Sequence, residues 1–414
     1  MTAHARTFAA AAALVLVLGM LAQHAAPRVN LPGRIDPARW VLQDFRDAVY
    51  YPVVAFLDGR NPYDQRAQAE TYPVGQGFPP YLPLTLVAHL PFGLVSQSEA
   101  DGLYVMAVLA LTVVLGALAL GGAGRPVTIA ATLGVTALLL LSRPGHMNLL
   151  LGQVTAQVVI GAYVALRWAR TRPPLAGLGL ALATLKPSYG VPLAVLMLLG
   201  RGDVTAVTAG AAMSAALCLA ALVPLAHAAG GIAPFVTSLS GSAAVFSAES
   251  TSNAWSSFAR VDVVALAARI LGHVPAGWIE AMLGLAVTVA GVIGLRRLRG
   301  DDSAPSVQLG VGLVCLTLLI GTYHQAYDAL LLAQPGVALA TGSWGRGAAA
   351  PPALRWTVLA LIAIPAVNYL ATGTMVSGLR IGSPTWLAVT AANPAALLAA
   401  WGIHLGLACR AGRR

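Results

Sequence analysis

The chain has 414 residues, of which 57% are hydrophobic and only 10% are charged, and its formal net charge is +10. A soluble protein of this length needs far more polar surface, so the composition excludes a soluble domain and predicts an all-α polytopic membrane protein. The arginines fall in short clusters between apolar runs, and phospholipid headgroups explain this positive excess without a nucleic-acid partner.

The first apolar run, about residues 8–21, fits either a cleaved signal peptide or a retained membrane anchor. We favour the anchor because the later segments need a cytoplasmic N-terminus to obey the positive-inside rule. Residues 27–95 then form a large first outer loop with short helices along the membrane surface. The end of this loop, about residues 78–94, is apolar but rich in proline, which indicates an interfacial or re-entrant segment rather than a full span.

The next spans are expected at about residues 103–120, 127–141 and 149–166. The apolar stretch 175–199 is interrupted by Lys186 and Pro187. Proline removes a backbone donor and a buried lysine needs a partner, so we expect two half-length helices that meet at a polar tip. If this stretch dips into the membrane and returns, Arg201 lies on the cytoplasmic side, together with the arginines of the loop 167–172.

The same rule places the other arginine clusters in the cytoplasm, and a second outer loop at about 227–275. These clusters are Arg125, the arginines of 296–299, the loop 346–355, and Arg410, Arg413 and Arg414. The remaining spans are expected at about 204–223, 278–295, 307–322, 326–340, 356–371 and 386–407. About eleven or twelve membrane segments then form a single domain over residues 1–414.

This topology brings the unusual polar residues to one side of the membrane. Residues far apart in the sequence are expected on the outer side or near it: Asp44, Asp47, the turn Arg143 to Asn148 with His146, the region of Asn253, and the segment 323–328. A shared outer site is the economical explanation, because acidic residues are scarce in this chain and polar groups in membrane proteins mark functional positions.

Each of these residues also has a purely structural explanation. Asp44 and Asp47, three residues apart, share a helical face and fit either a solvated helix start or a site. His324 fits an interfacial histidine, and Asp328, inside an apolar segment, fits a structural tie between helices. Lys186 is able to snorkel or to bind backbone carbonyls, although an anionic lipid phosphate would satisfy its charge better.

Several short motifs occur in a fixed order along residues 40–335. They are Asp44-Phe45-Arg46 with Tyr50, residues 58–64, Phe78-Pro79-Pro80-Tyr81, residues 90–92, Gly152-Gln153-Val154-Thr155, Leu185-Lys186-Pro187, Asn253 to Arg260, and His324-Gln325-Ala326-Tyr327-Asp328. In this order they resemble glycosyltransferase family 87. Thr155 stands where that family often has Asn, and Trp255 lies within the Asn-Ser element; both depart from the family pattern.

The resemblance implies a membrane-embedded bundle of the GT-C type, as in polyprenyl-phosphate-mannose-dependent mannosyltransferases and an arabinofuranosyltransferase. It implies an essential acid in the first outer loop, whose position matches Asp44 better than Asp47, and a carboxylate there suits the role of base toward an acceptor hydroxyl. His324 would position the phosphate or the acceptor. The expected substrate-binding residues are Arg46, Asp47, Tyr50, Arg143, His146, Gln153, Lys186, Asn253, Arg260, Gln325 and Asp328.

The expected reaction uses no cofactor and no metal. The co-substrate is a polyprenyl-phosphate sugar, the acceptor is a glycolipid or an envelope polysaccharide, and the site faces outward from the plasma membrane. The partner of the departing phosphate is expected among Lys186, Arg260, Arg143 and His324.

Two other classes remain open. A secondary transporter also has broken helices and intramembrane charges, although it usually has a midplane site and two similar halves. A non-catalytic scaffold or flippase partner would leave the acidic first loop unexplained. The bias toward Arg and Ala fits a GC-rich genome, such as that of an actinobacterium.

Overall fold

A computed structural model describes residues 2–29, 36, 39–249, 251–344 and 351–411. Within this part the chain forms helices and no β-strand, which confirms the predicted all-α polytopic class. Seven of the described helices, two of them continued by a short 3-10 turn, are long and apolar enough to cross a membrane. They are α1 (Ala3–Ala25), α7 (Gln97–Gly122), α13 (Val204–Ala228), α16 (Gly277–Leu298), α17 (Ala304–Gly321), α19 (Pro352–Val367) and α21 (Pro384–Ala411).

The other expected spans are shorter or interrupted helices. They are α8 (Ile129–Leu141), α10 (Thr155–Trp168), α11 (Pro173–Ala183), α12 (Pro187–Val195) with the π-helix η3 (Leu196–Arg201), and the 3-10 helix η4 (Ala326–Leu332) followed by α18 (Ala333–Thr341). The turn expected at 143–148 is instead a helix, α9 (Arg143–Leu151), which starts because the Ser142 hydroxyl accepts from Gly145 N–H. The span expected at 149–166 is interrupted at Gly152, which has a positive φ of 74°.

Both expected outer loops contain helices. The first loop holds short helices, as the sequence predicts: α2 (Gln43–Phe45), the π-helix η2 (Arg46–Tyr50), α3 (Tyr51–Leu57), α4 (Gln65–Thr71), α5 (Leu84–Ala88) and α6 (Leu90–Gly93). The second loop is less loop-like than expected, because α13 continues to Ala228 and two helices follow it. These are α14 (Ile232–Ala248) and α15 (Val263–Leu271).

The break in the stretch 175–199 falls where the sequence predicts it. Helix α11 ends at Ala183 and α12 begins at Pro187, and Lys186 between them is extended, as expected for a residue that precedes proline. The chain then returns to the end from which α11 started, because the Arg201 guanidinium donates to the Leu166 carbonyl over 3.0 Å. The predicted dip and return is therefore present.

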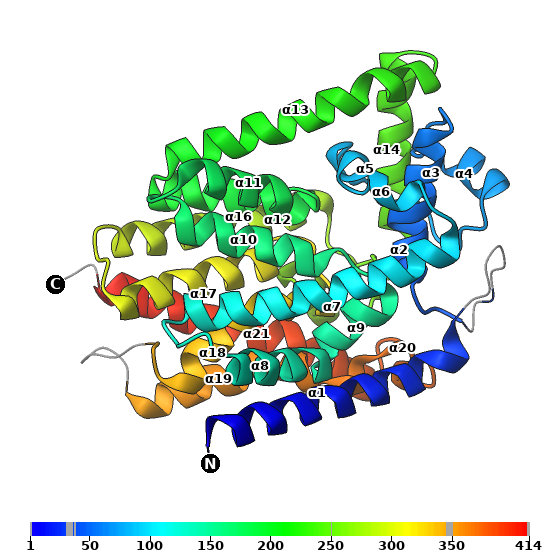
Figure 1. Cartoon of the computed structure of the whole chain (residues 1–414). Coiled ribbons are helices and arrows are strands. Elements are labelled where there is room, and N and C mark those ends of the chain that lie inside the picture. Colours follow the sequence, from blue (N-terminus) through cyan, green and yellow to red (C-terminus); the bar gives the residue numbers. More distant parts are fainter. Residues whose placement is uncertain (1, 30–35, 37–38, 250, 345–350, 412–414) are drawn as a thin grey trace.

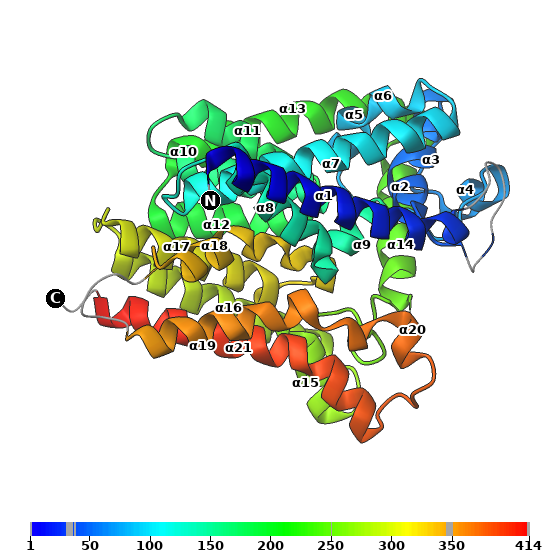
Figure 2. The ribbon, with the colours of Figure 1, turned by 60° about the horizontal axis from the view of Figure 1, so that its bottom comes forward.

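The two ends of the molecule differ in charge, because the arginine-rich loops gather at one of them. Residues 121–125, 166–172, 200–203 and 296–302 gather at one end, which we call the arginine end. Helix α1 begins and α21 ends toward this end, whereas α2 to α6 and the lower part of α14 lie at the other, which we call the Asp44 end (Figures 1 and 2). The grouping agrees with the expected sidedness of the arginine clusters. Arg346, Arg413 and Arg414 lie outside the described residues.

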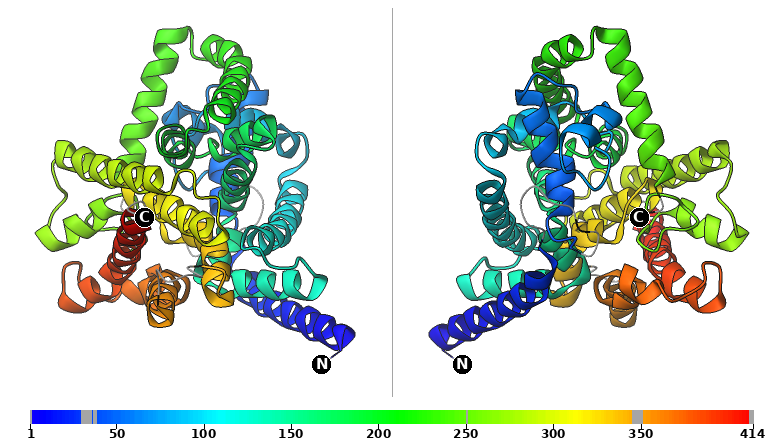
Figure 3. Two further views of the ribbon diagram at one scale, coloured as in Figure 1. Left: turned by 90° about the vertical axis from the view of Figure 1, so that its left-hand side faces the viewer. Right: turned by 90° about the vertical axis from the view of Figure 1, so that its right-hand side faces the viewer.

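The core is built around α17, which is buried along most of its length. Leu313, Val314, Cys315 and Leu316 are fully buried, and α16, α18, α21 and η4 pack against this helix. Views from the two ends show α1 and the α13–α14 pair projecting on different sides of the bundle (Figure 3). Helix α17 thus links the arginine end, where it begins, to the Asp44 end, where it leads into His324.

Candidate active site

The segment that carries Asp44 is fixed by backbone contacts and by one aromatic anchor. Leu42 takes a left-handed conformation with φ 60°, and its N–H donates to the Leu150 carbonyl over 2.6 Å. Phe45 is fully buried and stacks on Tyr104, with 4.0 Å between ring centroids. With Leu42 and Phe45 on either side of it held in this way, the partly exposed Asp44 side chain faces the turn between α9 and α10.

Gly152 allows this close approach. A Cβ atom at position 152 would lie 2.5 Å from the Phe45 Cβ and 3.2 Å from the Phe45 nitrogen. A side chain there would therefore push α2 away from α10, and it would also be strained by the positive φ. The Gly152-Gln153 pair has a specific role in the geometry: the glycine admits the segment of Asp44, and the next side chain binds it.

We expect Gly152→Ala to destabilise the protein by about 3 kcal/mol, because left-handed strain and overpacking add at this position. The matched control is Gly59→Ala, since Gly59 has a similar φ of 70° but nothing lies within 4 Å of the position that its Cβ atom would take. That control has only the backbone strain, about 1 kcal/mol. Thermal unfolding of both variants in detergent measures the difference, and equal midpoints would show that the contact with Phe45 is loose.

Asp44 is connected to Lys186 through Gln153. The Gln153 amide N–H donates to Asp44 Oδ2, and its Oε1 accepts from Lys186 Nζ at 3.1 Å. No described residue donates to Asp44 Oδ1. One oxygen of the carboxylate is thus fixed in place, and the other has no donor among the described residues.

Lys186 and Asp328 form a buried ion pair at the centre of the site. Lys186 Nζ lies 3.1 Å from Asp328 Oδ1 and donates to Thr155 Oγ1 at 2.7 Å, and Thr155 donates to the same carboxylate oxygen at 3.0 Å. The ammonium also lies 4.5 Å from the centroid of the Tyr327 ring. Because its three N–H donors are used by protein groups, the lysine is satisfied without a lipid phosphate.

His324 lies behind this ion pair. Its Nδ1 is 3.1 Å from Asp328 Oδ2, which also accepts from Gln325 N–H, and its ring packs edge-on against Tyr189 at 4.4 Å. The ring is fully buried, and its Nε2 has no hydrogen-bond partner among the described residues. The structure therefore places His324 beside Asp328, and its direct role toward a substrate stays a prediction.

Arg46, Asp47 and Tyr50 point away from this network and stabilise the first loop. Asp47 Oδ2 accepts from the backbone N–H groups of Gly75 and Gln76 at 3.1 and 2.8 Å. Arg46 forms two hydrogen bonds with Asp101, and the Tyr50 hydroxyl donates to the Val95 carbonyl. Each of these three side chains binds another group of the protein, and its contact with a substrate stays a prediction.

Arg143 and His146 lie apart from the Asp44 network. The Arg143 guanidinium is fully buried and donates to the Ala371 carbonyl, whereas His146 packs edge-on against His24 at 5.2 Å and lies near Tyr369. Asn148, on the same helix, does reach the network, because its amide donates to the Tyr327 carbonyl at 3.0 Å. Helix α9 thus contacts the Asp44 network through Asn148, whereas Arg143 at its start lies apart from Asp44.

Asn253, Arg260 and Gln325 form a clamp over the His324 segment. Arg260 and Gln325 form a backbone bridge, and Val261 N–H donates to the His324 carbonyl at 3.0 Å. The Arg260 guanidinium makes two 2.8 Å bonds to Asp262, and the Asn253 side chain accepts from two backbone N–H groups of its own turn. These side chains hold the second outer loop in place.

Two carboxyl groups of the first loop, those of Asp44 and Asp47, have raised pKa values. Burial raises the pKa of Asp44 to about 6, although the Gln153 hydrogen bond and the Lys186 charge lower it. Burial raises the pKa of Asp47 to about 7, against the lowering effect of its backbone hydrogen bonds. A carboxylate near pKa 6 is ionised at neutral pH and yet basic enough to accept a proton.

Sequence reasoning missed the residues that complete the network. Thr155 bridges Lys186 and Asp328, the Tyr189 hydroxyl donates to the Asp328 carbonyl at 3.1 Å, and Asp101 neutralises Arg46. Thr155 and Tyr189 lie in or next to motifs that the sequence already marks. Asp101 carried a usable signal, because it is one of the few acids at the start of an apolar helix.

Fold and site together define a polytopic membrane protein with a buried polar centre at one end of its helical bundle. The family model for glycosyltransferase family 87 matches residues 79–322. This range is more than half of the chain, so the chain belongs to glycosyltransferase family 87. No curated protein matches it, and neither does any solved structure. The match includes Gln153 and Lys186, begins after Asp44 and ends just before His324.

Proposed function

We propose that this glycosyltransferase moves a sugar, mannose in the first instance, from a polyprenyl-phosphate donor to a lipid-linked or envelope glycan acceptor. The observation that carries the proposal is the Asp44 carboxylate, which has one oxygen held by Gln153 and the other open. Family membership favours this enzyme over a transporter or a scaffold.

Asp44 acts as the base in this proposal. It takes the proton of the acceptor hydroxyl while the hydroxyl oxygen bonds to the anomeric carbon and the bond from that carbon to the phosphate oxygen breaks. The polyprenyl phosphate leaves as an anion and needs no proton. A single displacement inverts the anomeric centre, so a β-linked donor gives an α-linked product.

The leaving phosphate needs positive charge near Asp44. Lys186 is the candidate whose charge acts on Asp44, and Gln153 binds both side chains. Lys186 and Arg260 are each paired with an aspartate, Asp328 and Asp262, so the effect on Asp44 is what favours Lys186. Arg143 is buried against Ala371. We therefore propose that the positive charge of Lys186 stabilises the departing phosphate across a short distance.

The donor is lipid-linked because the site is proposed to face outward, where nucleotide sugars are absent. Support for this orientation comes from the arginine end, which lies opposite Asp44 and carries the cluster expected in the cytoplasm. The acceptor and the donor would both reach Asp44 from the outer leaflet of the plasma membrane.

The proposal is tested by comparing donors. Sealed vesicles that contain the protein are given polyprenyl-phosphate-[¹⁴C]mannose or GDP-[¹⁴C]mannose, and vesicles without the protein are the control. We expect label to enter glycolipid or polysaccharide from the lipid donor alone. Transfer from the nucleotide sugar with none from the lipid donor would contradict the proposal, and the same assay with a polyprenyl-phosphate pentose tests the choice of mannose.

A further inference from the structure

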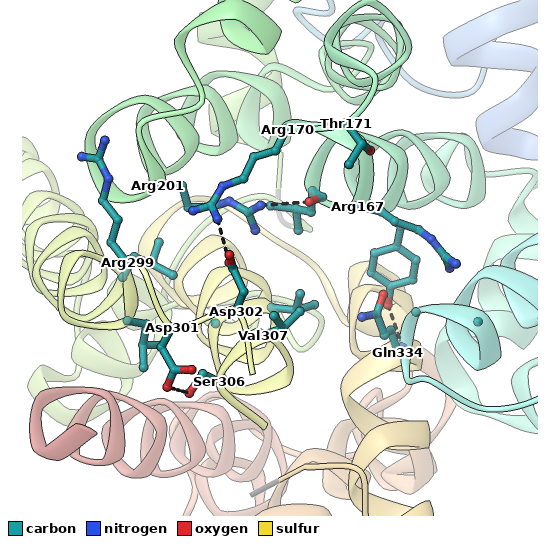
Figure 4. A pocket seen from close by; sticks show the side chains of 18 residues that line it. Arg167, Arg170, Thr171, Arg201, Arg299, Asp301, Asp302, Ser306, Val307 and Gln334 are labelled. Atoms are coloured by element: carbon teal, nitrogen blue, oxygen red, sulfur yellow. Dashed lines mark hydrogen bonds and ion pairs between the residues drawn. The ribbon is translucent and has the colours of Figure 1, made fainter. Parts of the chain in front are cut away.

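A cavity of about 570 Å³ opens at the arginine end of the bundle (Figure 4). It lies between the ends of α7, α10, η3 and α16 and the start of α17. Its charged lining residues are Arg167, Arg170, Arg201, Arg299, Asp301 and Asp302. Orientation in the membrane explains why arginines occur in these loops, but it does not explain why they surround one cavity.

The charges around this cavity are unbalanced. Four arginines line it against two aspartates. Asp302 pairs with Arg170 at 2.7 Å, whereas Asp301 is occupied by Ser306 Oγ at 2.5 Å and by Ser303 N–H. Arg167 and Arg299 form no ion pair with any described residue. The buried Asp203 beside the cavity pairs with Arg201 at 2.7 Å and lies 3.9 Å from Arg170, so the arginines of the cavity without a carboxylate partner in the described part of the chain are Arg167 and Arg299.

Glycines keep the space open where the arginines lie. A Cβ atom on Gly202 would lie 2.4 Å from an Arg299 guanidinium nitrogen, and one on Gly121 would lie 2.9 Å from an Arg167 guanidinium nitrogen. Figure 4 shows these two arginines on opposite sides of the cavity, with Arg170 between them. Their guanidinium groups point outward on either side and those of Arg170 and Arg201 lie between them, so positive charge surrounds the opening.

The cavity has apolar walls and a polar floor. Leu166, Leu295 and Leu298 line its walls. At its floor the Tyr163 hydroxyl accepts from the Gln334 backbone N–H at 2.8 Å, and both residues are buried. A cationic opening above apolar walls suits a ligand with an anionic head and an apolar body.

We propose that this cavity binds a phosphate group, carried by an anionic phospholipid or present as a free anion. The planar guanidinium group matches phosphate oxygens in a two-pronged geometry, and basic pockets between membrane helices suit anionic headgroups. The exposed pair of Arg170 and Asp302 holds weakly, so Arg170 is able to exchange the carboxylate for phosphate. This site is separate from the proposed transfer reaction.

The test uses the purified full-length protein in detergent, with binding followed by native mass spectrometry. The probes are dioctanoyl phosphatidic acid, dioctanoyl phosphatidylcholine and inorganic phosphate. We expect saturable binding of phosphatidic acid that is at least tenfold tighter than binding of phosphatidylcholine. Competition by inorganic phosphate would identify a free anion as the ligand, and a lack of competition would identify the lipid headgroup; both results support the site.

Two variants with opposite expected effects make the test specific. Arg167→Gln with Arg299→Gln removes the unpaired charges and is expected to weaken phosphatidic acid binding about tenfold or more. The matched control, Arg172→Gln with Arg297→Gln, removes the same charge from exposed positions that do not line the cavity.

The second variant, Asp302→Asn, removes the 2.7 Å partner of Arg170, which keeps only its 3.9 Å contact with Asp203. This variant is expected to tighten binding several-fold, which a folding defect would not do. Equal binding by the first variant and its control would overturn the proposal. Weaker binding by Asp302→Asn, or equal binding of the two lipids by the wild type, would overturn it as well.

Discussion

Asp44→Asn is expected to lower kcat/KM for sugar transfer by about 10²- to 10⁴-fold, because an amide cannot accept the proton of the acceptor hydroxyl. The substitution keeps the size of the side chain and an oxygen for the Gln153 hydrogen bond, so expression and folding should be retained. Transfer from a labelled polyprenyl-phosphate sugar in membranes measures the loss.

The control is Asp47→Asn, the same chemical change three residues away. An Asn oxygen at this position still accepts from Gly75 and Gln76 N–H, so we expect transfer to fall less than about tenfold. If Asp47→Asn were inactive and Asp44→Asn active, the role of base would belong to Asp47. Full activity in both variants would remove the base from this loop.

The pH dependence of transfer gives an independent check. A base must be unprotonated, and burial raises the pKa of Asp44 to about 6, so kcat/KM should fall as the pH drops through about 6. The residual activity of Asp44→Asn should lose this acidic limb. A limb that persists unchanged in the variant would assign the titration to another group.

The second large effect concerns the stability of the buried pair Lys186 and Asp328. Lys186→Met leaves the Asp328 carboxylate buried without its cationic partner, and we expect a loss of about 3–5 kcal/mol in the free energy of unfolding. The double variant Lys186→Met with Asp328→Asn removes both charges and should be more stable than Lys186→Met alone. Unfolding in detergent, followed by circular dichroism, measures both.

The exposed pair Arg170 and Asp302 provides the matched comparison. Arg170→Gln should cost only about 0.2–1 kcal/mol, because the side chains of Arg170 and Asp302 are 47% and 78% exposed, and because Asp203, 3.9 Å from Arg170, keeps its 2.7 Å bond to Arg201. A loss for Lys186→Met as small as that for Arg170→Gln would show that the lysine finds another partner or water.

The centre of the site could be predicted from the sequence because charge inside an apolar run demands a partner. Lys186 before a proline indicated a broken helix with a buried charge that needs a partner, and Asp328 in an apolar segment indicated a structural tie between helices. The structure adds that these two residues pair with each other. The arginine-rich loops fixed which segments share an end, and the break at Lys186 then placed it near Asp44. These inferences depend on the free-energy cost of burying an unpaired charge in a membrane. This cost is large and does not depend on how the side chains pack in detail.

The roles of the neighbouring residues could not be predicted in this way. Asp44 and Asp47 share a helical face by spacing, but the chain changes to a π-helix at Arg46, and the Asp47 carboxylate binds the backbone at Gly75 instead. Arg143 was expected in a turn at the shared site, but it begins helix α9 and is buried against Ala371. Such outcomes depend on local backbone geometry, which side-chain type alone does not determine.

The amide of Gln153 has a consequence for the reactivity of Asp44. Had the Lys186 ammonium touched Asp44 directly, its field would have made that carboxylate a feeble proton acceptor. The intervening Gln153 amide separates the two charged groups. It orients the Asp44 carboxylate and weakens the electrostatic influence of the Lys186 ammonium on it. A basic Asp44 carboxylate and the ammonium group that Asp328 holds are thereby able to lie close together, which suits a transfer in which the carboxylate accepts a proton while an anionic phosphate departs.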